Sequence, residues 1–353
     1  MALEDRLLEL AAEIPPLDAA AAEEARRRQL WLTKPAGSLG QLEEVGAQLA
    51  GIAGRCPPPV PESPVVVVCA GDHGVLDRGV SRWPREVTAA MVSNFCTGGA
   101  AVNAIAKTVG ARMSVLDVGV AGELERHPLL RAAKVRRGTG DLSRGPAMSR
   151  EEAARAVMAG AGVAEELVES GGVDLLVTGD MGIGNTTPAA ALISAFTGHP
   201  PEETTGRGTG IDDETLKLKL NVVKEALELH VPDSEDPLGV LAQIGGLEHA
   251  ANVGVILTGA VYGIPVILDG VVSDSAALVA RALALHSAGY VVAGHRSTEP
   301  GARISLQSLD VRPLLDLDMR LGEGTGGLLA VPLVQAAAKT LKEMAMLEEI
   351  GFG

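Results

Sequence analysis

The sequence is poor in aromatic residues and contains only three cysteines, Cys56, Cys69 and Cys96. Aromatic residues make up 2% of the 353 positions, so ligand recognition by extensive aromatic stacking has few side chains available. The cysteines are odd in number and show neither CxxC nor metal-ligand spacing. This pattern predicts reduced, mostly buried thiols and a cytoplasmic protein, not a disulfide framework.

Basic residues are outnumbered, because 30 Lys and Arg against 45 Asp and Glu give a formal net charge of −15. A negative charge favours solubility and opposes attraction to phosphate backbones, so we expect no nucleic-acid partner. No run reaches the roughly 20 uninterrupted apolar residues of a membrane span. The first residues, with Glu4, Asp5 and Arg6, do not resemble a signal peptide. We expect small-molecule partners and no membrane contact.

Aliphatic residues are abundant, and the hydrophobic content is 46%. Short apolar runs alternate with alanine-rich helical stretches, which predicts an α/β fold with a doubly wound parallel sheet covered on both faces. The predicted strands are residues 65–68, 113–118, 175–177, 266–268 and 290–292. The predicted helices between them are residues 84–110, 149–169, 212–230, 247–261 and 273–285.

The two ends of the chain are predicted to be helical. Helices are expected at residues 3–13, 18–31 and 40–53, followed by a proline-rich segment, 56–64, that cannot continue a helix. A last helix is expected at 326–348, returning to the first ones. We predict that residues 1–60 and 326–353 build a small helical domain and that residues 61–325 form the parallel α/β catalytic domain.

Polar residues follow or close each predicted strand, at the sheet edge where open parallel sheets bind ligands. Each set alone is equally typical of a turn, but five sets at one edge predict a ligand crevice. The sets are Asp72 and His73, Asp117, residues 180–187, Asp269, and His295 with Ser297.

Two glycine-rich loops are candidates for phosphate binding. In the first, residues 180–187, glycines allow close backbone approach and the following helix offers free amides and a positive dipole end. The second, residues 206–210, precedes a helix that contains Lys219. Neither matches the ATP phosphate loop or the dinucleotide fingerprint, so we predict the phosphate of a mononucleotide. The predicted contacts are Gly182, Ile183, Gly184, Asn185, Thr186, Thr187, Gly206 and Gly208.

Glu323 stands between two glycines in the loop of residues 319–326, just before the last predicted helix. A partly desolvated glutamate in such a loop can serve as a general base, although a solvated helix cap is the alternative. His73 and His295 lie in separate loops with no carboxylate at ligand spacing. We therefore predict no metal and no cofactor.

Six ordered motifs, from about residue 30 to 345, resemble the nicotinate-nucleotide:dimethylbenzimidazole phosphoribosyltransferase family. They are KPAGSLG at 34–40, DHGV at 72–75, GIGNTTP at 182–188, GG at 245–246, LDG at 268–270 and MRLGEGTG at 319–326. The resemblance implies a homodimer with a Rossmann-like sheet and a small domain built from both chain ends. It also implies transfer of the 5-phosphoribosyl group from nicotinate mononucleotide to 5,6-dimethylbenzimidazole, giving α-ribazole 5′-phosphate in cobalamin assembly.

The resemblance also assigns roles to residues. It implies that Glu323 is the catalytic base, that Lys219 lies near the phosphate and ribose, and that Ser297 lies near the nucleotide. Asp180 replaces the usual glutamate of the family and is a second candidate for a catalytic carboxylate. Asp269 is a further nucleotide-site candidate from its place after a strand. The predicted base pocket is Trp83, Met91, Leu321 and Gly322, where Trp83 and Met91 replace a serine and a glutamine of some members.

Two alternatives remain open from the sequence. The same transfer could use another acceptor, such as adenine or a phenol, or the chain could be a non-catalytic nucleotide-binding module. A carboxylate at Glu323 favours an enzyme, because a sensor has no need of a base beside the sugar.

Overall fold

The structure, a computed structural model, describes residues 3–352 and contains a six-stranded sheet in which all neighbouring strands are parallel. The strand order is β3-β2-β1-β4-β5-β6. The strands are β1 (Pro64–Gly71), β2 (Arg112–Gly119), β3 (Leu130–Ala132), β4 (Leu175–Met181), β5 (Val266–Leu268) and β6 (Val291–Ala293). The predicted α/β class with a doubly wound parallel sheet is confirmed.

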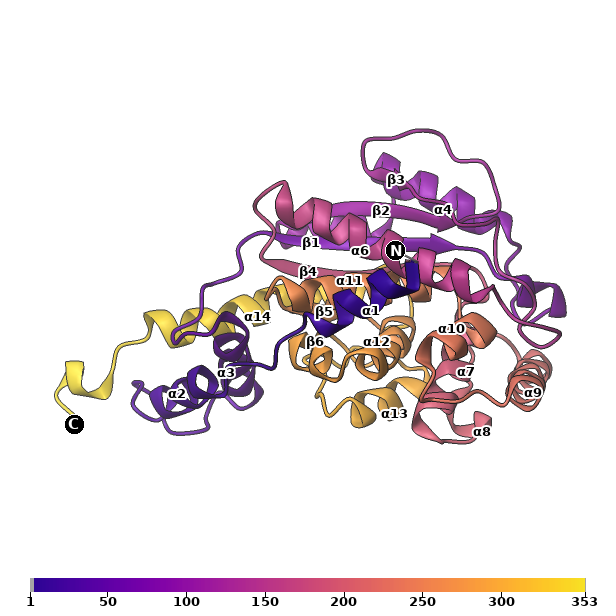
Figure 1. The fold of residues 1–353 in the computed structure, drawn as a ribbon. Helices are drawn as coiled ribbons and strands as arrows, with labels where there is room; N and C mark the ends of the chain where they lie inside the picture. Colours follow the sequence, from indigo (N-terminus) through magenta and orange to yellow (C-terminus); the bar gives the residue numbers. More distant parts are fainter. Residues whose placement is uncertain (1–2, 353) are drawn as a thin grey trace.

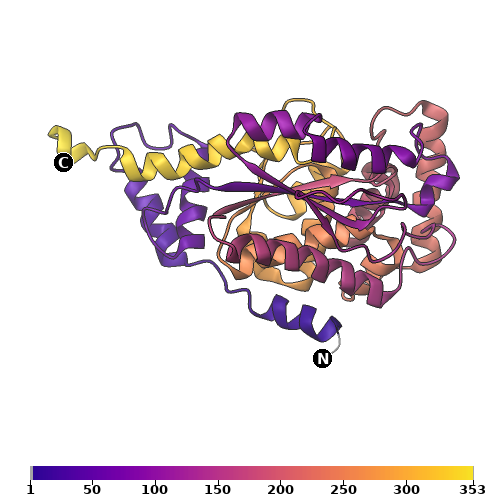
Figure 2. The ribbon, with the colours of Figure 1, turned by 90° about the horizontal axis from the view of Figure 1, so that it is seen from above.

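Helices cover both faces of this sheet (Figure 1, Figure 2). Alternate residues of β1 pack into the two layers: Val65 and Val67 face one, and Val66 and Val68 face the other. Because both faces are buried, β1 appears in the sequence as a continuous apolar run. One layer contains α6 (Arg150–Glu169), α11 (Leu247–Val261) and α12 (Val271–Leu283), and the other α4 (Glu86–Thr97), α5 (Ala101–Thr108) and α14 (Thr325–Glu343).

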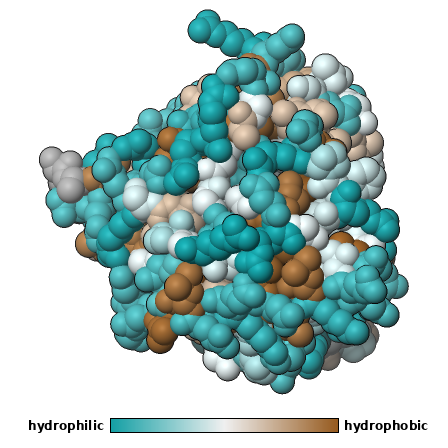
Figure 3. Space-filling model, turned by 90° about the vertical axis from the view of Figure 1, so that its right-hand side faces the viewer, coloured by the Kyte–Doolittle hydropathy of each residue, from teal (hydrophilic) through white to brown (hydrophobic). Residues whose placement is uncertain are grey.

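The centre of the sheet is the point where the strand order reverses. β1 and β4 are neighbours, and the chain continues from β1 to β2 on one side and from β4 to β5 on the other. The loops that follow β1 and β4 therefore diverge, which leaves a crevice at the carboxyl ends of the strands. Figure 3 shows the molecule from the right-hand side of Figure 1, toward which the arrowheads of β1 and β2 point. Small apolar patches lie among polar side chains on that face.

The helices at the two chain ends meet. α2 (Ala19–Gln29), α3 (Gln41–Ala53) and the end of α14 pack around Ala25, Ala47, Ala50 and Leu341. By contrast, α1 (Leu3–Ala12) packs on α6. The start of α14 covers the sheet, where Leu328 joins the same apolar cluster as β1. The division into two domains stays a prediction.

Several predicted elements need correction. Residues 84–110 form two helices, because the chain breaks after α4 at Gly98, whose φ is +84°. The last strand begins at Val291, since residues 285–290 form a 3-10 helix. The C-terminal helix ends at Glu343 instead of 348. β3 was not predicted, because it has three residues and none is buried. The other helices are α7 (Thr186–Thr197), α8 (Pro201–Thr204), α9 (Asp213–His230), α10 (Pro237–Ile244) and α13 (Pro300–Ser308).

One stretch of the described chain, Glu86–Thr108, is apolar and long enough by composition to cross a membrane. It corresponds to α4 and α5, which both pack against the sheet, and α5 also packs against α14. A core helix of a soluble protein passes the same test, so this stretch is weak evidence for a membrane span.

Candidate active site

A cavity of about 490 Å³ lies at the carboxyl edge of the sheet and brings together most of the predicted site residues. They come from the end of β4 and the loop after it, from the loop after β6, from the turn at residues 206–210, from the segment around α4 and from the loop before α14. The wall includes Trp83, Met91, Asp180, Gly182, Ile183, Asn185, Thr186, Gly208, Ser297, Leu321, Gly322 and Glu323. The other predicted residues, Gly184, Thr187, Gly206, Lys219 and Asp269, do not line this cavity.

The backbone around Glu323 is held in an unusual conformation. Glu323 has a φ of +65° between Gly322 at +83° and Gly324 at +88°. A non-glycine residue in the left-handed region costs about 1–3 kcal/mol and persists only where its surroundings fix it. Asp269 provides this restraint, because its carboxylate accepts hydrogen bonds from the amides of Gly324, Gly326 and Gly327 at 2.7–3.0 Å. Its oxygens are thus engaged in holding the Glu323 loop, and its predicted contact with a nucleotide stays a prediction.

The Glu323 carboxyl group is buried and incompletely bonded. Its side chain is 4% exposed, and its Oε2 atom has no hydrogen-bond partner among residues 3–352. Burial, reinforced by the negative charge of Asp269, raises the pKa of Glu323 to about 7. The reference pKa of a glutamate, about 4.3, would leave it fully ionised at neutral pH. Glu323 is instead poised near neutrality, where a general base works best.

Asp180 connects the two loops on either side of the cavity. Its Oδ1 atom accepts a hydrogen bond of 2.7 Å from the side-chain amide of Asn185, and its carbonyl oxygen accepts one of 3.2 Å from the amide of Glu323. Burial, together with repulsion from Asp269 and Glu248, raises its pKa well above the ordinary range. A catalytic role for it stays a prediction.

Lys219 lies buried beneath the two glycine-rich loops and links them. Its ammonium group donates to Oγ1 of Thr186 at 2.7 Å and to the carbonyl oxygen of Gly206 at 3.0 Å. Burial lowers the pKa of Lys219 to about 8, against the opposing effect of Glu299. The lysine thus holds a positive charge under the place where a phosphate is expected.

Some amides of the 182–187 loop are already engaged. Ile183 donates to Oγ1 of Thr88, and the amides of Asn185 and Thr187 donate to carbonyl oxygens within the loop. Within the described chain, the amides of Gly182, Gly184 and Thr186 donate to no protein atom. These three, just before and at the start of α7, are the amides left to bind an anion.

The other end of the cavity is apolar. The exposed side chains of Trp83 and Leu321 stand at its edge, 48% and 50% exposed. Val87, Met91 and Ile183 complete this end. A flat heteroaromatic ring suits such a surface, since aromatic and aliphatic contacts fix it without directional bonds.

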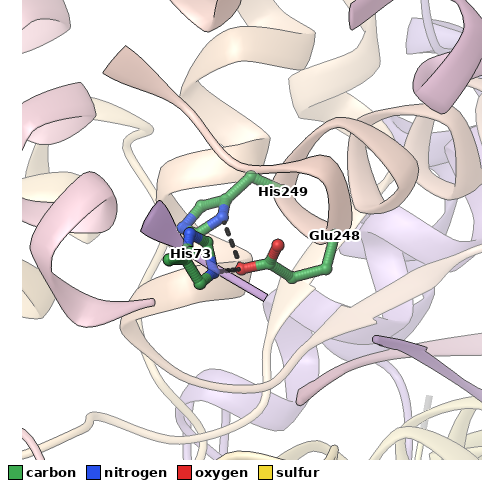
Figure 4. A group of neighbouring side chains, drawn as sticks. All are labelled: His73, Glu248 and His249. Atoms are coloured by element: carbon green, nitrogen blue, oxygen red, sulfur yellow. Dashed lines mark hydrogen bonds and ion pairs between the residues drawn. The ribbon is translucent and has the colours of Figure 1, made fainter. Parts of the chain in front are cut away.

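His73, which the sequence placed at the same edge, lies buried in a cluster of its own (Figure 4). Its Nε2 atom is 2.6 Å from Oε1 of Glu248, and Nδ1 of His249 is 2.9 Å from the same oxygen. Although burial alone would raise the pKa of Glu248, the two imidazoles outweigh it and lower the pKa to about 2. The sequence had given His73 no carboxylate partner, and α11 supplies one from 175 positions away.

The cluster also meets the donor set of a metal site, since its ligand atoms lie within 4.8 Å of one another. However, ligands at about 2.0–2.1 Å from a tetrahedral zinc ion stand more than about 3 Å apart. A separation of 2.6 Å between His73 and Glu248 is that of a direct hydrogen bond. The geometry favours a direct hydrogen bond over shared metal coordination, and the expected absence of a metal stays a prediction.

Sequence reasoning missed several residues of the cavity. Glu299 and Arg320 line it, although Glu299 was not singled out from the sequence and Arg320 was included only as part of the motif at 319–326. Glu299 is 6% exposed, and its Oε1 accepts a hydrogen bond of 2.7 Å from the amide of Gly208. Its position directly before Pro300, at the start of α13, was the available signal.

A buried carboxylate and a cavity at the switch point of a doubly wound sheet define the general class, an α/β nucleotide-binding enzyme. Comparison with known proteins defines the family. The phosphoribosyltransferase family profile matches residues 14–351. The chain is 53% identical to the nicotinate-nucleotide–dimethylbenzimidazole phosphoribosyltransferase of Salinispora tropica, covering 96% of this chain and 97% of the relative. The chain is 54% identical to the enzyme of that name from Chloroflexus aggregans, and the match covers 96% of this chain and 95% of the relative.

A solved structure gives the same result. The crystal structure of the Thermus thermophilus enzyme of this name aligns with a TM-score of 0.90 and 47% identity, covering 96% of this chain and 99% of that one. The chain belongs to the nicotinate-nucleotide–dimethylbenzimidazole phosphoribosyltransferase family. The resemblance seen in the sequence motifs is confirmed.

Proposed function

We propose that this enzyme transfers the 5-phosphoribosyl group of nicotinate mononucleotide to 5,6-dimethylbenzimidazole, in the lower-ligand step of cobalamin assembly. The relatives carry this activity in their names. The observation that carries the proposal is Glu323, a buried carboxyl group with a pKa near 7 at the junction of an apolar pocket and a polar one.

The reaction needs little beyond positioning and one base. Nicotinate leaves C1′ of the ribose as its ring nitrogen changes from a positively charged pyridinium to a neutral pyridine. An imidazole-ring nitrogen of the acceptor forms the new bond to C1′ from the opposite face. Glu323 accepts the remaining N–H proton of the acceptor, and the loops fix the distance between the reactants.

The geometry supports the remaining roles that we propose for the site residues. The phosphate is placed over Lys219, between the amides of residues 182–187 and the turn at 206–210, and Ser297 faces the ribose. The acceptor ring lies between Trp83, Met91 and Leu321, beside Gly322. Asp180 keeps the two loops in register. We further propose a cytoplasmic homodimer, as the family resemblance implies.

The direct test is a turnover assay with nicotinate mononucleotide and a panel of acceptors, followed by chromatography of nicotinate and of the new nucleotide. We expect release of nicotinate and formation of α-ribazole 5′-phosphate with dimethylbenzimidazole. Faster transfer to adenine or to a phenol would replace the acceptor assignment. No release of nicotinate with any acceptor would refute the proposed transfer.

A further inference from the structure

Arg320 lies on a wall that two cavities share. The active-site cavity and a neighbouring one of about 440 Å³ have Gly208, Glu299 and Arg320 in common. The second cavity is otherwise lined mainly by the turn at residues 206–210 and by the start of α13. Arg320 therefore stands beside the glycine turn, at the polar end of the site.

The Arg320 side chain is exposed, and none of the hydrogen bonds or ion pairs among residues 3–352 involves its guanidinium group. The other arginine at this wall, Arg207, is paired with Asp213 and donates to the carbonyl oxygen of Ile211. A guanidinium group presents a fixed fork of donors that matches a phosphate. Arg320 is the cation of this wall that is available to a ligand.

The backbone on both sides of Arg320 is tied to the rest of the site. The carbonyl oxygen of Met319 accepts a hydrogen bond of 3.2 Å from the amide of Thr298, and the amide of Glu323 donates to Asp180 at 3.2 Å. Arg320 thus lies in a short segment, residues 319–323, that is held at both ends and also contains the general base Glu323. A group bound by Arg320 is held at a defined distance from Glu323.

The charges around the glycine turn show why a further cation is needed. Lys219 contributes one positive charge, but Glu299 places a carboxylate on the amide of Gly208 and opposes it. Without Arg320 the net charge of these groups is about zero, and a neutral site binds a dianionic phosphate poorly. With Arg320 the turn gains a net positive charge on the side facing the cavity.

We propose that Arg320 binds the 5′-phosphate of the phosphoribosyl donor, opposite Lys219, and that it makes the enzyme select phosphorylated donors over the free nucleoside. This inference rests on the proposed transfer. It adds a phosphate ligand that the glycine-rich loops do not themselves supply, and it assigns the second cavity to the phosphate end of the donor.

The test compares two donors, nicotinate mononucleotide and its nucleoside, nicotinate riboside, at a saturating concentration of dimethylbenzimidazole. We expect Arg320→Gln to lower kcat/KM for the nucleotide by about 10- to 100-fold, the range of a charge-assisted hydrogen bond, with less than about a twofold change for the riboside. Arg320→Lys should recover part of the loss, since it restores the charge without the fork. Arg303→Gln removes an exposed arginine outside the cavity wall and is the matched control.

An equal fall for both donors, or no fall for the nucleotide, would overturn the proposal. Calorimetric titration with ribose 5-phosphate separates this outcome from a failure of the transfer itself, because it needs no turnover. Arg320→Gln should weaken that binding by a similar factor whether or not nicotinate mononucleotide is a substrate. Unchanged affinity for ribose 5-phosphate would overturn the assignment of Arg320 as a phosphate ligand.

Discussion

Two buried glutamates stand at the starts of helices in this enzyme, and their acidities are opposite. Glu248, at the start of α11, has a pKa lowered to about 2, whereas Glu323, just before α14, has a pKa raised to about 7. Both side chains are nearly inaccessible to solvent. Burial therefore does not decide the ionisation of these groups by itself.

The partners make the difference. Glu248 has the imidazoles of His73 and His249 within 2.9 Å of one oxygen, while Glu323 has a neighbouring negative charge on Asp269 and an oxygen without a partner. A buried charge that is paired contributes to the fold, and a buried acid that is not paired is free to exchange a proton. The comparison predicts that loss of one damages stability and loss of the other damages chemistry.

The largest expected effect is on turnover at Glu323. Glu323→Gln keeps the size of the side chain but removes the proton acceptor, so kcat should fall by about 10²–10⁴-fold. Nucleotide affinity should remain within about twofold. The measurement is steady-state turnover of dimethylbenzimidazole at saturating nicotinate mononucleotide, with nucleotide binding followed by calorimetry. Turnover at the parent rate would remove Glu323 as the base and leave Asp180 as the next carboxylate to test.

The second effect concerns the free energy of unfolding. Glu248→Gln removes the charge that pairs with His73, so the free energy of unfolding should fall by roughly 3–5 kcal/mol, as when one partner of a buried ion pair is lost. Glu323→Gln is the matched control and should change it by less than about 1 kcal/mol, because the glutamine oxygen can keep the hydrogen bond from the amide of Val102. Chemical denaturation at pH 7.5 measures both. Equal destabilisation by the two variants would contradict the division of roles.

The third prediction uses pH. Glu323 must be ionised to accept a proton, so kcat/KM should rise with pH through about 7, and it should fall above about 8 as Lys219 loses its charge. The donor phosphate has a pKa near 6, so the profile is best read above about pH 6.5. In Glu323→Gln the rising limb should disappear while the falling limb stays. A flat parent profile between pH 6.5 and 9 would show that neither group titrates in the free enzyme.

The pH dependence of the free energy of unfolding should reflect Glu248. Because the pKa of Glu248 is lowered in the folded state, its contribution is fully present above the unfolded value, about 4.3, and is lost as the pH falls toward about 2. Denaturation of the parent protein between pH 7 and pH 3 should show this loss, and Glu248→Gln should show a shallower dependence. The same dependence in both would mean that other carboxylates account for it.

The sequence predicted the features that depend on local pattern. The apolar run of residues 65–68 lies on β1 as expected, because a buried strand shows in the local sequence. The polar segment of residues 180–187 begins at the end of β4 and reaches the start of α7, and its glycines mark the turn between them. β3 was missed because its three residues carry no buried run. The break at Gly98 was missed because helical alanines continue on both sides of it.

Features that depend on distant contacts could not be predicted. The pairing of His73 with Glu248 joins positions 175 residues apart, and nothing near either residue announces it. The engagement of Glu299 by Gly208 is of the same kind, across 91 positions. The raised pKa of Glu323 is also of this kind, because burial and the charge of Asp269 raise it, and only the folded chain brings these together.

The smallest expected effect concerns Asp269, whose negative charge helps to raise the pKa of Glu323. Asp269→Asn removes that charge, so the rising limb of the kcat/KM profile should move to lower pH by less than about one unit. An asparagine amide can turn only one oxygen toward the amides of Gly324, Gly326 and Gly327, so the loop should also loosen and kcat should fall at every pH. Crystallography of the variant separates the two effects, because a loosened loop that exposes Glu323 would also lower its pKa, through solvation. A shift to higher pH with an unmoved loop would contradict the electrostatic role of Asp269, and the raised pKa of Glu323 would then be due to burial alone.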